Sequence, residues 1–468
     1  MLFNTLQFAL FAALVLTITR SVSPRLRPSV LLWSSLVFYA LWIPIYLLLL
    51  LGDVAVNYLL LRAMVRSVRP RLFLALAVAF TLSVLACFKY AVFLTSSVTP
   101  LAEALLAWSP PHLDIVLPLG ISFFSFQLLG LTIDVYRGDV EPPASFARYT
   151  LFIAFFPQLI AGPILRGSQL LPQLATGGAI TPDRTRRGWW LIAAGLAKKS
   201  LLADFLLAPF VDQVFGMPGV ASAPAHLIAV YAFAFQIYFD FSGYTDMARG
   251  IACLLGFELP LNFAEPYLSR NPVEFWRRWH MTLSGWLRDY LYIPLGGNRR
   301  GRARTDLNLF ITMLLGGLWH GAAWNFVIWG GLHGAWLALH RLVSGGRRAP
   351  TGEPGLGDLP RIVLTFHAVC LLWIFFRANG FDDALTILTV LARGDYAHAS
   401  WPLLQLGIVA LCCTLQVCER AIRLHLSTVR TALGSTWGTA IEGALFGAIV
   451  GLAIVVSGAG GEFIYFQF

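Results

Sequence analysis

Apolar runs of about 20 residues recur along most of the chain, and short polar loops separate them. An α-helix of that length crosses the hydrocarbon core of a bilayer. No polar block is long enough to form a separate soluble domain of typical size. The pattern predicts an all-α polytopic membrane protein with a single domain over residues 1–468. We expect spans near residues 3–19, 29–50, 52–65, 72–95, 115–136, 188–209, 226–256, 362–378, 401–419 and 436–457.

The basic residues indicate which side of the membrane each loop occupies. They cluster near 20–27, 62–71, 184–199, 299–304, 341–361 and 420–430, while loops 96–115 and 210–225 contain no Lys or Arg. Cytoplasmic loops carry such an excess of basic residues. We therefore expect both termini on the extracytoplasmic side. The first apolar run lacks the basic start of a signal peptide, so we interpret it as the first span.

Region 149–165 does not fit this alternation, because the basic loops on both sides of it have cytoplasmic character. Pro157, Gly162 and Pro163 interrupt the run, and Gln158 adds a polar group. Non-helical backbone at membrane depth is tolerated only where protein or a water-filled cavity satisfies it. We predict a re-entrant or half-crossing segment, with an interfacial helix as the alternative. Elsewhere, Pro44 and Pro118 are expected to kink their helices.

Composition supports the membrane assignment and excludes one class of partner. The 468 residues are 57% hydrophobic and 12% charged, and the mean hydropathy is +0.70. Soluble domains are about one quarter charged. The net charge of +10 would suit nucleic acid, but the cations lie in loops between spans instead of on one face. We interpret them as a topology signal and expect contact with lipid, with no nucleic-acid partner.

Segment 231–250 places ionisable side chains inside an apolar run. Such groups at membrane depth are costly and are functional candidates by default. Asp240 has no oppositely charged neighbour at helical spacing, so it is expected to line a hydrophilic path or to bind a distant His or Arg. Tyr244 follows one turn later. A purely structural carboxylate remains the alternative for Asp240.

A polar, aromatic helix is predicted over residues 271–294. Asn271 is a suitable N-cap, Pro272 suits the first helical position, and Glu274 is placed to complete a capping box. We expect this amphipathic helix to lie at the cytoplasmic interface, with Arg277 facing water or lipid phosphate. His280 is expected to project toward the protein interior.

Residues 306–341 are expected to form a hairpin, which together with the polar span makes 231–341 the core motif region. Arg304 and Arg341 are both assigned to the cytoplasm, so the chain between them must enter the membrane and return. His320 lies near the middle, about 18 Å from Asn308 if that segment is helical. This depth makes His320 the main candidate for chemistry.

Trp319, Asn325 and His333 accompany His320 in the hairpin. We expect His333 to pack or to form hydrogen bonds there. Metal binding by His280, His320 and His333 is disfavoured, because no HExxH motif or carboxylate at ligand spacing is present, and we expect no metal. A Ser-His-Asp site is disfavoured because no GxSxG motif occurs.

Six segments together resemble the membrane-bound O-acyltransferase (MBOAT) superfamily, above all its bacterial branch of alginate O-acetylation membrane subunits. The segments are FFSFQLLGLTIDVYRG (123–138), FFPQLIAGPILR (155–166), YFDFSGYTDMARG (238–250), EFWRRWHMTLSGWLRDYLYIPLGGNRRG (274–301), LWHGAAWNFVIWGGLHG (318–334) and FIYFQF (463–468). The resemblance implies a ring of about 11–13 transmembrane or re-entrant helices around a thinned centre, where an outer funnel meets a cytoplasmic tunnel. It also implies a bacterial cytoplasmic (inner) membrane location.

The resemblance further implies that His320 is the catalytic histidine and His280 the second characteristic one. Residues expected to line the substrate path are Trp319, Asn325, Asp240, Arg277, Gln158 and Tyr244. The implied donor is acetyl-CoA or a carrier-bound acyl thioester, with no permanently bound cofactor. The implied acceptor is an exopolysaccharide hydroxyl, such as one of alginate, or a Ser of an exported partner acetyltransferase beside the export machinery.

Two other functions are also compatible with a polar path through a membrane protein. A transporter or flippase for lipid-linked sugar needs similar polar groups, but the chain shows no internal repeat of its halves. A non-catalytic scaffold of an export complex is the second alternative. If acylation is catalysed, His320 is expected to act as general base, with Asn325, the Trp indoles or His280 as donors to the oxyanion.

Overall fold

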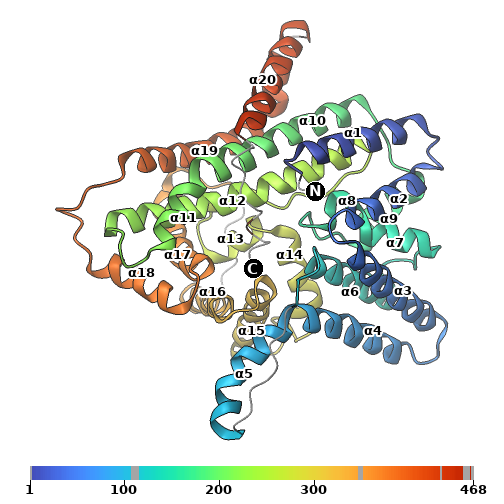
Figure 1. Ribbon diagram of the computed structural model, residues 1–468, viewed down its shortest axis with the longest axis horizontal. Coiled ribbons are helices and arrows are strands. Elements are labelled where there is room, and N and C mark those ends of the chain that lie inside the picture. The colour runs from blue at the N-terminus through green and yellow to red at the C-terminus, as the bar shows by residue number, and fades with distance from the viewer. Residues whose placement is uncertain (1–2, 107–114, 346–351, 433–434, 457–463, 465–468) are drawn as a thin grey trace. The chain divides into compact units, whose positions relative to one another are not determined.

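The computed structural model describes residues 3–106, 115–345, 352–432, 435–456 and 464 (Figure 1). All regular structure in those residues is helical, which confirms the predicted all-α class. Contacts divide the chain into two units, Met1–Ile192 with Met247–Pro260 and Ala193–Asp246 with Leu261–Phe468. The ring arrangement, the number of 11–13 helices and the single domain stay predictions.

Among the residues that the structure describes, five helices are long and apolar enough to cross a membrane, which agrees with a multi-pass protein. They are Pro44–Arg66, Pro70–Leu105, Ala223–Leu254, Leu356–Arg377 and Leu403–Ala421. Among them Ala223–Leu254 is the most buried inside the protein. Its polar side chains are therefore packed mainly against protein, which makes specific pairing of its charges necessary.

The first unit contains the helices before residue 193 and the end of α12. They are α1 (Leu6–Ser21), α2 (Arg27–Ala40), α3 (Pro44–Arg66), α4 (Pro70–Leu85), the π-helix η1 (Ala86–Tyr90), α5 (Ala91–Leu106), α6 (Ile121–Arg137), α7 (Phe146–Ala154), α8 (Phe156–Leu159), α9 (Gly167–Thr176) and most of α10 (Pro182–Leu196). The helices α4, η1 and α5 follow one another without a break and form one long helix.

Both predicted proline kinks are wrong. The predicted span 29–50 is divided between α2 and α3, and Pro44 stands at the start of α3. Pro118 precedes α6 instead of lying within it. Proline has no N–H to donate, so it fits the first turn of a helix but interrupts its interior. Gly120 completes the approach to α6 with φ of 72°, where a Cβ would meet the Leu159 carbonyl oxygen at 2.5 Å.

The predicted interruption of segment 149–165 is confirmed. Helix α7 ends at Ala154, and the short α8 begins after Phe155. Gln158 is fully buried, and its Nε2 donates to the Phe152 carbonyl at 2.8 Å. This side chain therefore satisfies backbone that the break leaves without a helical partner. Whether the segment crosses or re-enters the membrane stays a prediction.

The second unit contains the remaining helices. They are η2 (Ala197–Leu207, a π-helix), α11 (Ala208–Gly216), most of α12 (Ala223–Leu254), the 3₁₀-helix η3 (Pro266–Leu268), α13 (Pro272–Arg278), α14 (Met281–Leu287), the π-helix η4 (Arg288–Tyr292), α15 (Arg302–His320), α16 (Trp324–Val343), the 3₁₀-helix η5 (Leu356–Asp358), α17 (Leu359–Arg377), α18 (Phe381–Arg393), α19 (Leu403–Ala432) and α20 (Ser435–Val456).

The single helix predicted over 271–294 is wrong, because the chain breaks between α13 and α14. His280 has φ of 42°, in the left-handed region. The predicted start is correct, since the Asn271 side chain accepts from the Glu274 N–H at 2.9 Å. The Glu274 carboxylate, however, accepts from the Arg270 N–H rather than completing a capping box with Asn271. The interfacial position of this segment stays a prediction.

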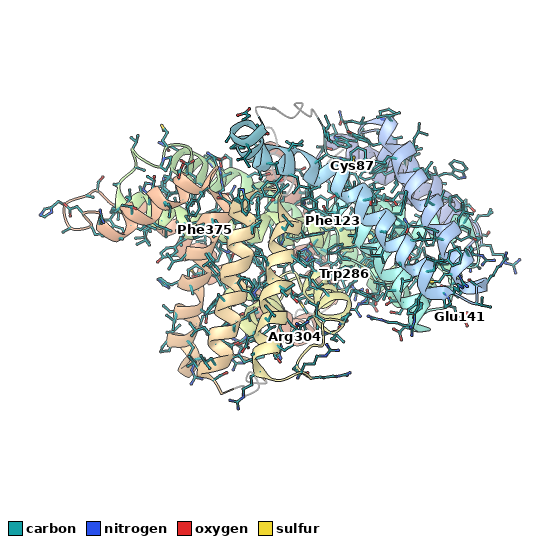
Figure 2. All side chains as sticks on the ribbon, turned by 90° about the horizontal axis from the view of Figure 1, so that it is seen from below. Cys87, Phe123, Glu141, Trp286, Arg304 and Phe375 are labelled. Carbon is teal, nitrogen blue, oxygen red and sulfur yellow. The ribbon has the colours of Figure 1, made fainter. Side chains whose placement is uncertain are left out.

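The predicted hairpin is confirmed as two helices, α15 and α16, that pack against each other. Figure 2 shows them side by side, with Arg304 near one end. Gly317 and Gly330 let the two backbones approach closely. A Cβ on Gly317 would lie 2.2 Å from the Phe326 carbonyl oxygen and 2.8 Å from the Gly330 Cα. Small residues at this crossing therefore allow the two helices to pack with their backbones in contact.

Replacing Gly317 with alanine is expected to destabilise the protein by about 1–3 kcal/mol, because the added methyl group meets backbone that cannot rotate away. Gly331→Ala is the matched control, since its Cβ would meet only side-chain atoms of Leu314 and Phe310, at 3.6 Å or more. Thermal unfolding in detergent measures both variants. Equal melting temperatures for the two variants would contradict the close crossing.

The predicted topology can be tested at two exposed positions of the second unit. Ala303 lies in a basic segment assigned to the cytoplasm, and Ser222 lies in a loop assigned to the outside. Single cysteines there, introduced after removal of the exposed Cys87, Cys413 and Cys418, are expected to react with an impermeant maleimide from opposite sides. Labelling of both from one side would overturn the assignment.

Candidate active site

His320 is the last residue of α15 and is 3% exposed. Its ring is enclosed by other rings, and four of them lie within 6.4 Å between centroids: Trp319 (5.0 Å), Trp329 (5.2 Å), Phe376 (5.5 Å) and His280 (6.4 Å). Aromatic walls exclude water, so a charge that forms at this imidazole interacts strongly with nearby dipoles. The structure thus brings three predicted site residues together, namely His320, His280 and Trp319.

Glycine and asparagine residues hold the turn after His320. A Cβ on Gly321 would lie 2.1 Å from the Phe326 ring, so only glycine fits there. Asn325 is buried at the start of α16, and its Nδ2 donates to the Ala378 carbonyl at 3.0 Å. This bond ties the hairpin turn to the end of α17. Asn325 therefore has a structural role in addition to the predicted role at the substrate path.

His280 is fully buried, and Asn262 orients its ring. The Asn262 Oδ1 lies 3.2 Å from the His280 Nδ1 and accepts from the Thr282 N–H at 3.1 Å. The Thr282 donor identifies this amide atom as the oxygen, so Nδ1 of His280 carries the proton. In the neutral ring Nε2 is then an acceptor, which does not suit the predicted role of oxyanion donor.

Burial also fixes the charge of His280. It lies in the turn between α13 and α14, outside the helices that are long enough to span the membrane. Burial lowers the pKa of His280 to about 3. The ring is therefore neutral at physiological pH, because removing it from water disfavours the imidazolium form. Phe241 of α12 packs edge-on against it, with the centroids 4.7 Å apart.

Asp240 forms a buried ion pair that the sequence did not predict. Its Oδ1 lies 2.5 Å from Nζ of Lys199, and the same ammonium group lies 2.9 Å from Oδ1 of Asp204. The Ile464 N–H donates to the other oxygen of Asp240 at 2.9 Å. One lysine thus serves two carboxylates inside the protein. The expected distant partner of Asp240 is therefore a lysine rather than a His or Arg.

Lys198 makes a second pairing of the same kind. It binds Asp246 of α12 at 2.8 Å and also Glu419 of α19. Glu419 in turn accepts from the Tyr238 hydroxyl at 2.7 Å. Both lysines lie at the end of the basic cluster 184–199, where it overlaps the predicted span 188–209. The structure places them in the π-helix η2, in agreement with the span, and Lys199 is 2% exposed there.

The remaining predicted path residues lie on several elements. Tyr244 is buried on α12, one turn after Asp240. Arg277 is exposed on α13, as expected for a residue that faces water or lipid phosphate. Gln158 belongs to the first unit, whereas His320 belongs to the second. A role at the substrate path stays a prediction for all three.

Sequence reasoning missed several neighbours of the histidines. Asn262, Trp329, Phe376 and Lys199 were not singled out, although all of them contact a predicted site residue. Trp329 and Phe376 have no special local pattern among so many aromatic residues. Only Asn262 could have been found from the sequence, because a polar side chain in an apolar segment needs a hydrogen-bond partner.

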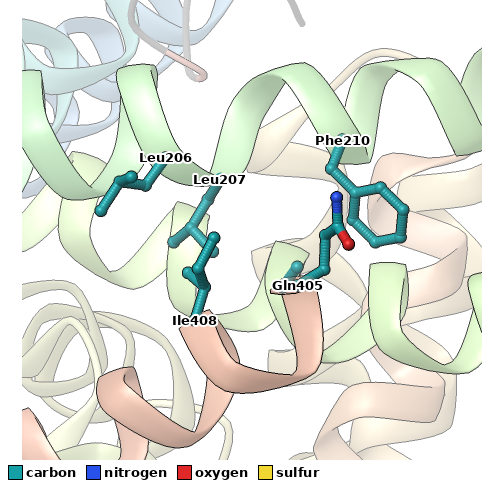
Figure 3. Close-up of a pocket in the computed structure, with 6 residues that line it drawn as sticks. Leu206, Leu207, Phe210, Gln405 and Ile408 are labelled. Atoms are coloured by element: carbon teal, nitrogen blue, oxygen red, sulfur yellow. The ribbon is translucent and has the colours of Figure 1, made fainter. Parts of the chain in front are cut away.

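A depression elsewhere in the second unit is a poor candidate for the site (Figure 3). It lies between η2, α11, α12 and α19, and its lining is almost entirely apolar. The lining residues are Leu206, Leu207, Phe210, Ala232, Gln405 and Ile408. Gln405 is the single polar member, so the depression offers no acid, base or nucleophile.

Comparison with known proteins decides the family. The profile described as MBOAT, membrane-bound O-acyltransferase family, matches residues 29–376, which include both histidines and all the rings around His320. The chain belongs to the membrane-bound O-acyltransferase family. The predicted family is thereby confirmed, and the pair of His280 and His320 lies within the part of the chain that matches this MBOAT family.

The names of individual MBOAT relatives refer to different polymers, namely alginate, peptidoglycan and teichoic acid. The chain is 40% identical to the probable alginate O-acetylase AlgI of Pseudomonas aeruginosa, over 82% of this chain and 72% of that protein. It is 37% identical to the peptidoglycan O-acetyltransferase of Helicobacter pylori, over 76% and 72%. It is 28% identical to the teichoic acid D-alanyltransferase of Bacillus subtilis, over 58% and 71%. Together with the family match, these names support a membrane O-acyltransferase as the class of this MBOAT chain.

Proposed function

We propose that this MBOAT protein transfers an acetyl group from a cytoplasmic thioester to an extracytoplasmic hydroxyl group, with His320 as general base. The observation that carries the proposal is the burial of His320 among aromatic rings at the turn of the α15–α16 hairpin. The predicted topology places both ends of this hairpin in the cytoplasm. His320 then lies at a depth that substrates from opposite sides can reach.

The chemistry requires one group that accepts and then returns a proton. The acceptor hydroxyl oxygen attacks the thioester carbonyl carbon while His320 removes the hydroxyl proton. The resulting tetrahedral intermediate collapses as the C–S bond breaks, and the imidazolium returns the proton to the leaving thiolate. An imidazole, whose ordinary pKa is about 6.5, suits both steps. A donor for the oxyanion is also needed, and indole N–H groups and Asn325 are the candidates.

The names of the relatives support an acetyl group and a polymer of the cell envelope. We infer that the acceptor is an exopolysaccharide hydroxyl, such as one of alginate, or a Ser of an exported acetyltransferase that passes the group on. The donor is acetyl-CoA or a carrier-bound thioester. The same proposal places this protein in the inner membrane of a bacterium, in contact with an export machinery.

Membrane vesicles of both orientations test the direction of transfer. We expect everted vesicles, which expose the cytoplasmic face, to convert added labelled acetyl-CoA into ester-linked label in the lumen. Right-side-out vesicles should not, and vesicles from cells without the chain are the control. Equal labelling from both sides would contradict the proposal. Intact labelled thioester in the lumen would instead favour a transporter.

A further inference from the structure

A basic loop, residues 296–304, joins η4 to α15 and includes the first turn of that helix. Its exposed basic side chains are Arg299, Arg300, Arg302 and Arg304. The nearest acidic residues along the chain already have partners. Asp289 pairs with Arg288 at 2.6 Å, and Asp306 with Arg341 at 2.5 Å. Among the residues that the structure describes, no carboxylate pairs with any of the four loop arginines, so their positive charges are not neutralised there.

Hydrogen bonds from both helices of the hairpin hold the backbone of the basic loop. Asn308 of α15 is fully buried, and its Nδ2 donates to the Gly297 carbonyl at 3.0 Å. From α16, Nη1 of Arg341 donates to the Arg302 carbonyl at 3.1 Å. The loop arginines therefore project from a backbone that is already ordered. Binding of a ligand then costs less conformational entropy than it would on a free loop.

The exposed face of α15 indicates the depth of the loop in the membrane. Leu307 and Leu315 are 45% and 42% exposed, and at helical spacing they lie on the same face as Arg304. In a membrane protein an exposed apolar face of this kind contacts lipid tails. The two leucines are about 12 Å apart along the helix, which is most of the roughly 15 Å of hydrocarbon in one leaflet. Arg304, one turn before Leu307, is therefore at the level of the lipid headgroups.

Phosphate is the chemical group that this arrangement fits best. A guanidinium group presents a planar fork of donors that matches two phosphate oxygens, and it stays charged at physiological pH. Anionic phospholipids of the cytoplasmic leaflet present phosphates at headgroup level and attract basic residues beside a membrane helix. A soluble phosphate compound would not require an exposed apolar face next to the arginines. The two leucines therefore favour a lipid as the source of the phosphate.

We propose that the basic loop binds the phosphate groups of anionic phospholipids in the cytoplasmic leaflet, and that this contact stabilises the hairpin that carries His320. Asn308 and Arg341 join the loop to α15 and α16, so a lipid that binds the loop also restrains the ends of both helices. Lipid binding at this loop requires the predicted topology but not the proposed acetyl transfer. The two proposals can therefore fail separately.

Lipid binding is measured first, with the purified full-length protein in a neutral detergent and without substrate. Native mass spectrometry compares bound dioleoylphosphatidylglycerol with bound dioleoylphosphatidylcholine, which has the same chains but no net charge. We expect the wild type to prefer the anionic lipid by about tenfold or more. One basic residue near an anionic surface changes affinity by about fivefold. The quadruple variant Arg299→Gln, Arg300→Gln, Arg302→Gln and Arg304→Gln should therefore lose at least about fivefold of the preference.

A second quadruple variant is the matched control for net charge. It replaces four other exposed arginines that are assigned to the cytoplasm, namely Arg20, Arg25, Arg66 and Arg69, with glutamine. The preference should then fall by no more than about twofold. Equal losses in the two quadruple variants would mean that net charge attracts the lipid and would overturn the proposal. A wild type that binds both lipids equally would also overturn it.

Thermal unfolding tests the stabilisation of the hairpin. Phosphatidylglycerol should raise the melting temperature of the wild type more than phosphatidylcholine does, and this difference should largely disappear without the four loop arginines. In phosphatidylcholine alone, the loop variant and the wild type should melt within about 1 °C of each other, because no anionic headgroup is then present. An equal rise in the loop variant would contradict stabilisation through the loop.

Competition identifies the source of the phosphate. An excess of coenzyme A, or of an acidic acyl carrier protein, should leave the bound phosphatidylglycerol in place. Release of the lipid by either one would assign the loop to a soluble donor and would overturn the proposal. His320→Ala should keep the lipid preference of the wild type, so the result for the loop does not depend on whether His320 is catalytic.

Discussion

His320→Ala is expected to reduce ester-linked acetate on secreted polymer by a factor on the order of 10²–10⁴, which is the usual contribution of a positioned general base. Alanine removes the proton acceptor and leaves the surrounding rings in place. The assay compares acetate released by mild alkali from cells that express either the variant or the wild type. The amount of protein in the membrane is measured in the same samples.

His340→Ala is the matched control for that experiment, since His340 lies on the same hairpin but is part-exposed. It should keep acetylation within about twofold, as expected of a surface substitution. Normal acetylation by His320→Ala at normal protein level would exclude catalysis by this residue. It would then favour a scaffold or a transporter as the function of the chain.

Lys199→Met is expected to lower the free energy of unfolding by about 3–5 kcal/mol, the usual cost of removing one partner from a buried ion pair. The variant leaves two buried carboxylates, Asp204 and Asp240, without their ammonium group. Methionine keeps most of the side-chain volume, so the loss reports on charge and not on packing. Denaturant titration of the detergent-solubilised protein measures the change.

Neutralising the partners should reverse much of that loss. Lys199→Met combined with Asp204→Asn and Asp240→Asn removes every charge of the cluster while nearly preserving its shape, so stability should recover by at least half. Arg299→Gln in the exposed basic loop is the control and should change stability by less than about 0.5 kcal/mol. A Lys199→Met protein as stable as the wild type would mean that the ion pair is not required.

The sequence was sufficient to predict the hairpin and the start of α13, because the signals for both are local. Basic residues at both ends indicated that the chain between Arg304 and Arg341 returns to the same side. The close crossing of the two helices at Gly317 and Gly330 was seen only in the structure. Asn271 before Pro272 identified a helix start, because capping involves only the next three residues.

The features that were mispredicted depend on partners far away in the sequence. No proline or glycine marks the break at His280, and the bonds that stabilise it come from Asn262, 18 residues earlier. Lys199 lies in the predicted span 188–209, but nothing in its local context indicated an ion pair, and its partner Asp240 is 41 positions away. A contact of this kind leaves no periodic pattern, so hydropathy and charge alone cannot predict it.

The amide oxygen of Asn262 has a consequence for how this segment can change in evolution. It holds the imidazole of His280 and both the N–H and the hydroxyl of Thr282. This one oxygen therefore fixes the course of the polypeptide after α13. It also determines which nitrogen of the His280 ring, which lies beside His320, carries the proton. Mutation at position 262 alone would disturb both at once. Positions 262 and 282 should consequently co-vary among related sequences that keep a histidine at 280, and such correlated changes would mark this turn even where overall identity is low.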